Sequence, residues 1–272
     1  GLAITTGNYN TYLGAQSGAT NTTGSSNVAV GINSQQGASS GSNSNNTSVG
    51  SNSLKSVTTG SNNIALGHSA SYTLTEGTNN VALGYEAGYT MTTSSNTVLI
   101  GRKAGYAINS NDANGTVAIG FESLMDLTDG QYNTALGMSS AYNITAGNQN
   151  TALGYQSLYQ ATGTSDTTCV GYQSGYYATG SYNTYIGNKA GKSASGANGS
   201  WNVAVGDNAL EAQTTGKKNI AIGYQAGNLI TTGEQNTIIG YDADVDANDR
   251  DGCIVIGSGL SLNTASDNVV EI

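Results

Sequence analysis

A short motif recurs along the whole chain: Asn, a β-branched residue, a small residue, an aliphatic residue and Gly. Fifteen copies occur in 272 residues, and of the fourteen intervals between their glycines ten are 17 residues, three are 19 and one is 16. A fixed period of this length predicts one structural unit per repeat, each stacked on the next, and therefore a solenoid. We expect the motif glycines to hold a tight corner or a positive φ; they are Gly14, Gly31, Gly50, Gly67, Gly84, Gly101, Gly120, Gly137, Gly154, Gly171, Gly187, Gly206, Gly223, Gly240 and Gly257.

The three residues before each glycine predict a β-strand. Val, Ile or Thr stands three positions before the glycine in all fifteen copies, and Leu, Val or Ile stands one position before it. These residue types suit a pleated surface, and the two positions share one face of a strand. We expect this aliphatic face to cover the interior of the coil. The small middle residue, such as Ala82, Ala135 or Ala152, then lies on a flat outer face that a second chain could cover.

The rest of the repeat predicts how coils stack. Asn stands four positions before the glycine in eleven of fifteen copies, and stacked amides can bond to one another at strand spacing, about 4.8 Å. An apolar site follows seven positions after the glycine, as at Leu74 and Ile230, and a Thr-Thr-Gly turn closes several coils. We therefore expect two short strands and two Gly-rich turns per coil.

Composition supports one repeat domain and excludes several functions. The chain has no Pro, which suits a fully paired stack. Its Lys and Arg residues total eight and are scattered, so no basic stripe favours nucleic acid. No apolar run reaches about 18 residues, so we expect no membrane insertion by this segment. Residues 1–257 are predicted to form the solenoid, with the chain beginning mid-repeat. Residues 258–272 are predicted to form an irregular terminal coil or cap, because Glu271 takes an aliphatic position and Ile272 the place of a glycine.

Catalysis finds little support, and we predict that the chain is not an enzyme. His68 is the only histidine, so no Ser-His-Asp set is evident, and the carboxylates are dispersed. Cys169 and Cys253 lie five coils apart, too far to pair within one chain. No cofactor is expected. The exception is an acidic run with Asp242, Asp244 and Asp246, where alternating Asp could ligate calcium, although a solvated turn is favoured.

Two features suggest contact surfaces. Tyrosines stand directly after several motif glycines and should form a stripe, which favours packing between coils or chains over stacking on sugars; they are Tyr85, Tyr155, Tyr172, Tyr224 and Tyr241. The three 19-residue intervals place extra residues around 33–45, 107–114 and 193–201. The third contains Trp201, the only tryptophan and our candidate ligand contact, although it could also simply cover a coil edge.

The pattern Asn-Val-Ala-Leu-Gly-Tyr-x-Ala at 80–87, with close copies at 150–157 and 219–226, resembles the head repeats of trimeric autotransporter adhesins. The longer form with a Thr-Thr-Gly turn is similar to repeats of tail and surface fibres of phages and large algal viruses. This resemblance covers essentially the whole chain and implies a left-handed parallel β-roll and a homotrimer. The adhesin coils are a few residues shorter, which favours the virus and phage group.

The sequence thus predicts an all-β parallel β-solenoid of about fifteen 17-residue coils in a homotrimeric fibre. The favoured function is a viral or phage tail or surface fibre segment that forms or presents a receptor-binding shaft. The alternative is the head of a bacterial trimeric autotransporter adhesin. Ice binding is disfavoured, because the Thr-Thr pairs adjoin Gly in turns. The expected partner is a host cell-surface receptor or glycan, and the expected location is the virion surface or the cell exterior.

Overall fold

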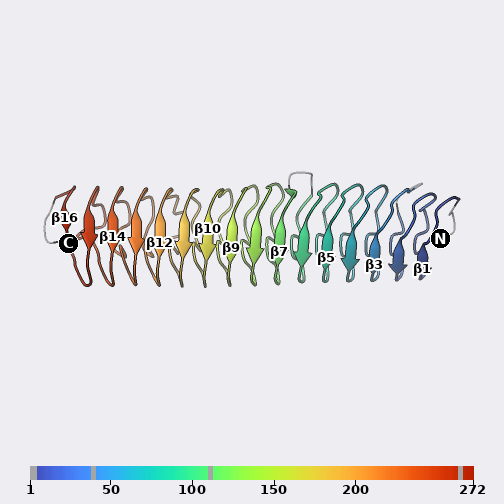
Figure 1. The fold of residues 1–272 in the computed structure, drawn as a ribbon, viewed down its shortest axis with the longest axis horizontal. Coiled ribbons are helices and arrows are strands. Elements are labelled where there is room, and N and C mark those ends of the chain that lie inside the picture. The colour runs from blue at the N-terminus through green and yellow to red at the C-terminus, as the bar shows by residue number, and fades with distance from the viewer. Residues whose placement is uncertain (1–4, 38–40, 110–112, 263–265) are drawn as a thin grey trace. The chain divides into compact units, whose positions relative to one another are not determined.

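A computed structural model describes residues 5–37, 41–109, 113–262 and 266–272. In this part of the chain the fold is an all-β parallel solenoid of about fifteen turns with no α-helix, as predicted (Figure 1). The chain divides into two compact units, Gly1–Leu136 and Gly137–Ile272. Each unit is a stack of coils, and each coil contributes one short strand.

The first unit contains strands β1 to β8 and the second contains β9 to β16. In the first they are Thr11–Leu13, Val28–Val30, Thr47–Val49, Ile64–Leu66, Val81–Leu83, Val98–Ile100, Val117–Ile119 and Thr134–Leu136. In the second they are Thr151–Leu153, Thr168–Val170, Thr184–Ile186, Val203–Val205, Ile220–Ile222, Thr237–Ile239, Ile254–Ile256 and Val270–Glu271. Within each unit every strand pairs in parallel with the next strand along the chain.

The strand register follows the motif and ignores the variation in repeat length. Val98 pairs with Val117 across a 19-residue interval, and Thr168 pairs with Thr184 across the 16-residue one. The residues added or removed therefore lie in the turns. This is expected where one face of a strand is buried, because a slip of one residue would turn every side chain to the wrong face.

The predicted orientation of the strands is wrong. The middle residue of the motif points into the coil: Ala82, Ala135 and Ala152 are fully buried within the single chain, so they cannot face a threefold axis. The aliphatic residues on either side point outward, and Ile64 and Leu66 are 43% and 39% exposed. The strand faces the opposite way from the prediction because the coil is narrow. Side chains from the turns opposite the strand fill its interior.

Residues four and seven positions after the motif glycine fill the interior. The apolar sites at seven, including Leu74, Met91 and Ile230, are fully buried as predicted. In several coils the residue at four is large where the middle strand residue is small, or the reverse. Ala152 is followed by Leu158, whereas Tyr185 is followed by Gly191, where a Cβ would collide with the tyrosine ring. Interiors packed to this density have no room for two large side chains at the same level.

Each described coil has one strand rather than the two predicted. The remainder of the coil consists of turns in which residues five before, two after and four after the motif glycine adopt a left-handed backbone. Residues with side chains take this conformation repeatedly, as at Asn62, Glu86 and Leu124, with φ values of 61°, 55° and 49°. The motif glycines have φ from 131° to 156°. A Cβ on Gly84 would lie 2.5 Å from the carbonyl oxygen of Gly101, so these glycines also permit close stacking.

Within each unit, stacked asparagines form buried hydrogen-bonded rows, as predicted. The side-chain oxygen of Asn219 accepts hydrogen bonds from the backbone and side-chain nitrogens of Asn236, both at 3.0 Å. The Asn219 amide donates to the carbonyl of Gly233 at 2.8 Å, and its backbone N–H donates to the Asn202 side-chain oxygen at 2.9 Å. Where Thr97 replaces Asn, its N–H and hydroxyl donate to Asn80.

The last strand continues the stack in a register that sequence alignment misses by one residue. Val270 pairs with Ile254, and Glu271 pairs with Val255, which is an inward position. The sequence predicts Glu271 at the aliphatic position one before the missing glycine and a coil that leaves the regular path, whereas the structure places Glu271 at the middle position of a strand that continues the stack. Asn268 has φ 59°, as do residues five before the glycine in regular coils, which supports the shifted register. Glu271 is half-buried.

We predict that Asn219→Ala destabilises the protein by about 2–4 kcal/mol, because it leaves the N–H groups of Asn236 and the carbonyl of Gly233 unpaired in a buried row. Asn228→Ala, at a half-buried position in the same coil, is the matched control and should change stability by less than about 0.5 kcal/mol. Urea unfolding followed by circular dichroism measures both. Equal effects of the two substitutions would contradict a special role for the row.

Candidate functional surface

The outward-facing strand residues form an aliphatic strip, which we define as the residues one and three positions before each motif glycine. Most are partly exposed, and those above one-third exposure are Leu13, Val28, Val49, Ile64, Leu66, Leu136, Ile186, Ile220, Ile222 and Ile256. Eight strands spaced by about 4.8 Å and three residues long give roughly 400 Å² of such surface in each unit. Soluble monomers rarely expose contiguous apolar patches larger than a few hundred Å², and such patches mark interaction sites.

A row of aromatic residues flanks one edge of the strip. It consists of residues directly after the motif glycines, here called the +1 row. Tyr155 and Tyr172 stack with ring centroids 5.4 Å apart, and Tyr224 and Tyr241 stack at 5.1 Å. His68 stacks on Tyr85 at 5.4 Å, so the only histidine belongs to this surface row. The predicted tyrosine stripe is therefore present, and its rings contact one another between coils.

The opposite edge carries the −5 row, which consists of residues five positions before the motif glycines. Trp201 belongs to this row and stacks on Tyr182, with centroids 5.5 Å apart and planes inclined by 4°. It is 53% exposed. Its location in a regular row, rather than at the tip of a loop, could not be seen from the interval lengths alone. That Trp201 contacts a ligand stays a prediction.

Ring stacking along these rows limits what the aromatic residues can bind. Stacking on a sugar needs a free ring face, and each stacked pair uses one face of both rings, so the area left for a sugar is reduced. A third row consists of residues five positions after the motif glycines, where Tyr89 stacks between Tyr72 and Tyr106 with ring centroids 5.0 and 5.3 Å apart. Stacked rings of this kind suit packing against another protein surface.

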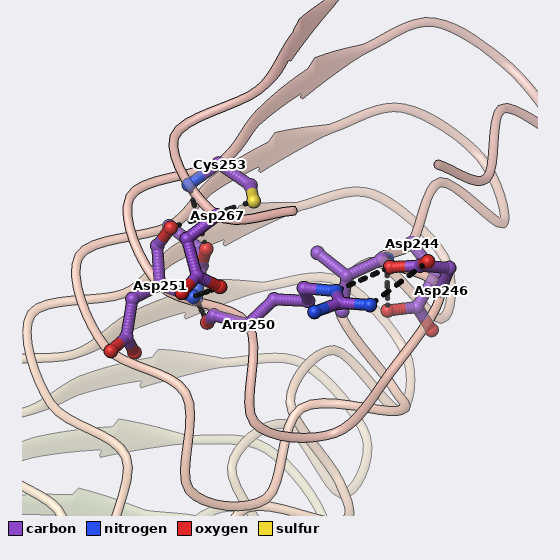
Figure 2. A network of polar contacts seen from close by, with 8 residues as sticks. Asp244, Asp246, Arg250, Asp251, Cys253 and Asp267 are labelled. Atoms are coloured by element: carbon purple, nitrogen blue, oxygen red, sulfur yellow. Dashed lines mark hydrogen bonds and ion pairs between the residues drawn. The ribbon is translucent and has the colours of Figure 1, made fainter. Parts of the chain in front are cut away.

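The acidic run near the C-terminus forms a local network rather than a cluster of metal ligands (Figure 2). Arg250 donates two hydrogen bonds to Asp246, at 2.6 and 3.2 Å. Asp251 accepts a hydrogen bond from the backbone N–H of Glu234 at 2.6 Å, and its own N–H donates to Asp267 at 3.1 Å. The described residues bring together no group of three or more His, Cys, Asp or Glu side chains that could hold a metal ion. Nothing in this part of the structure supports the calcium interpretation.

Asp244 differs from its neighbours because it is partly inside the coil. Its two oxygens accept hydrogen bonds from the backbone N–H groups of Leu229 and Val245, both at 2.8 Å. Desolvation nevertheless dominates and raises the pKa of Asp244 to about 6, with a smaller contribution from the nearby Asp242. The buried Cys169 thiol also has a raised pKa because of desolvation, which makes it unreactive.

The first threonine of the Thr-Thr and related turns uses its hydroxyl to stack the coils. Thr58, Thr75 and Thr214 each donate from the side-chain hydroxyl to a carbonyl of the next coil, at 3.0–3.1 Å. These groups therefore stabilise stacking. The longer intervals give little further chemistry: residues 38–40 and 110–112 lie outside the described residues, and Ser193 bonds to the carbonyl of Gly191.

No family model matches the chain, and no curated protein matches it at a significant level. In the described part of the chain there is no helix long and apolar enough to cross a membrane. The strongest functional indication is therefore the surface itself: an aliphatic strip bordered by two partly aromatic rows.

We predict that, as the pH rises from 4 to 7, the free energy of unfolding decreases more in the wild type than in Asp244→Asn. The folded-state pKa of about 6 exceeds the ordinary value of 3.8, so the folded protein binds this proton more tightly than the unfolded chain does. The carboxylate therefore costs nothing below about pH 3.8, and its full penalty is present above pH 6. Allowing for partial solvent access, the difference should be about 1–2 kcal/mol.

Urea unfolding at both pH values measures this difference. Asp249→Asn removes one exposed charge from the same segment and serves as the control. A pH dependence in Asp244→Asn that equals that of the wild type would show that Asp244 is not the group responsible.

Proposed function

We propose that this chain is a structural and adhesive fibre segment whose copies associate through the aliphatic strip into a homotrimer. The favoured setting is a viral or phage tail or surface fibre that contacts a host-cell receptor or glycan. The observation that carries the proposal is the strip itself, since one chain leaves Ile220 and Ile222 38% and 39% exposed in a regular, repeated arrangement. A face of this kind has the apolar centre and mixed rim of a protein interface.

The surface outside the strip also supports this proposal. It is rich in Asn, Ser, Thr and Gly, with only 9% charged residues in the chain. The described residues hold no metal cluster, and the coils are closed by hydrogen bonds between neighbours. Such a chain is suited to a stiff repeated element that presents a surface. The resemblance of its repeats to those of fibres and adhesin heads supports the same function.

We expect Ile220→Thr with Ile222→Thr to weaken association by at least about a hundredfold, because two aliphatic side chains per copy no longer leave water. Threonine retains the β-branched shape, so the strand itself should persist. Light scattering should give about 82 kDa for three wild-type chains of 27.4 kDa and a smaller mass for the double variant. Leu229→Thr, which removes an even more exposed aliphatic residue outside the strip, should leave the mass unchanged.

A wild-type protein that stays a single chain at all concentrations would overturn the proposed assembly. Adhesion is tested separately, with labelled wild-type protein on a glycan array and on bacterial and algal cells, and the double variant as the comparison. Retained attachment by the monomeric variant would locate binding in single chains. Absence of attachment by an assembled wild type would make this segment a passive spacer.

A further inference from the structure

The two rows beside the aliphatic strip lie at opposite edges of one face. Moving along a coil, residues five, three and one before the glycine and one after it point outward, while the residues four and two before it are buried. Six residues at strand spacing separate the −5 row from the +1 row by up to roughly 20 Å. Among the described residues, the ring contacts of the two rows join neighbouring coils of the same row.

The two rows nevertheless exchange aromatic residues coil by coil. In six successive coils of the second unit, every coil has one aromatic residue in one row and none in the other. Reading the −5 residue and then the +1 residue, the pairs are Gln149 and Tyr155, Asp166 and Tyr172, Tyr182 and Asn188, Trp201 and Asp207, Lys218 and Tyr224, and Gln235 and Tyr241. The other coils with an aromatic residue also have it in one row only, with the pairs Tyr9 and Ala15, Asn62 and His68, Asn79 and Tyr85, Gly115 and Phe121, and Tyr132 and Met138.

A contact between chains explains why aromatic residues alternate between two edges that share no ring contact in one chain. We propose that adjacent copies lie parallel and without stagger, so that the +1 row of one copy packs against the −5 row of the next at the same coil. This inference rests on the proposed assembly and adds its register and the residues that determine it. It assigns Trp201 to a contact between copies, opposite Asp207 of a neighbouring copy, in place of ligand contact.

The alternatives pack less well. A shift of one coil in one direction brings Tyr172 against Tyr182 and leaves the level of Asp207 and Lys218 without a ring, although these two side chains could then form an ion pair. A shift in the other direction brings Tyr224 against Trp201. Each shift thus crowds one level and leaves a gap at another, and both errors destabilise a closely packed contact. Copies running in opposite directions would place each row against itself, which gives the size exchange no role.

The test introduces an aromatic residue in the −5 row of a coil that already has one in the +1 row. Asp166→Trp puts a second ring opposite Tyr172 and should weaken association at least tenfold, as measured by sedimentation equilibrium. The swap Asp166→Trp with Tyr172→Asp restores one ring per level and should recover association to within about threefold of the wild type. Within one chain, Asp166 is exposed with φ 54°, and Trp201 occupies the same row at φ 59°, so the coil accepts the new side chain.

A second experiment measures the register directly. Gln149→Cys with Tyr155→Cys places thiols at one level of two copies and should give disulfide-linked multimers on non-reducing gels. Gln149→Cys with Asn188→Cys offsets them by two coils, about 10 Å, which is too far for a disulfide, so it should give none. Cys169 and Cys253 are buried and do not interfere.

The outcomes separate this inference from the assembly on which it rests. A wild type that never associates overturns the assembly and the register together. The register alone is overturned if the wild type associates and one of three results is obtained. These are that Asp166→Trp has no effect, that the swap does not restore association, or that only the offset cysteine pair crosslinks. Should Asp166→Trp reduce the thermal midpoint of the fold, Asp166→Tyr replaces it, and the cysteine pairs decide the register independently.

Discussion

The buried row of asparagine side chains is the interaction on which the stack depends. Each amide accepts hydrogen bonds from the next coil and donates to a carbonyl there, so Asn63 is bonded to Asn46 on one side and to Gly77 and Asn80 on the other. Short three-residue strands alone fix only a small part of a 17-residue coil. The row fixes the turn that leads into every strand and holds it at strand spacing. Because a buried unpaired amide is costly, the row also opposes any slip between coils.

Two consequences follow from a coil that is fixed at this corner. The strand has only one residue pointing inward, so the interior must be filled by residues from the turns, and the sizes of Tyr185 and Gly191 have to match. The two outward residues of every strand then have no partner in the same chain. The aliphatic strip is therefore a direct result of how narrow the coil is, and its exposure provides the free energy that an assembly of copies can use.

Much of the fold could be predicted from the sequence because its signals repeat. The period, the parallel strands, the asparagine row and the buried sites at Leu74 and Ile230 each depend on a position that recurs. The orientation of the strand could not be predicted in the same way. Both faces of each strand are apolar, so the alternation of side chains does not show which face points inward. The usual preference for larger residues in the interior also fails, because the coil is only wide enough for Ala82 at this position. The one-residue error at Glu271 has a similar origin, because a degenerate motif can be aligned in two registers.

The candidate surface was only partly visible from the sequence, and the reason is geometric. The tyrosines after the motif glycines were evident as a stripe, but that Tyr182 and Trp201 form a matching row needs the left-handed turn that carries them outward at the other edge. The structure shows that the −5 row and the +1 row lie at the two edges of the aliphatic strip. In the second unit no described coil has an aromatic ring in both rows, and this pattern then calls for an explanation. In the assembly that we propose, the two edges of neighbouring copies meet, and one ring at each level fills the contact. The aliphatic strip between the edges would then lie at the centre of the same contact.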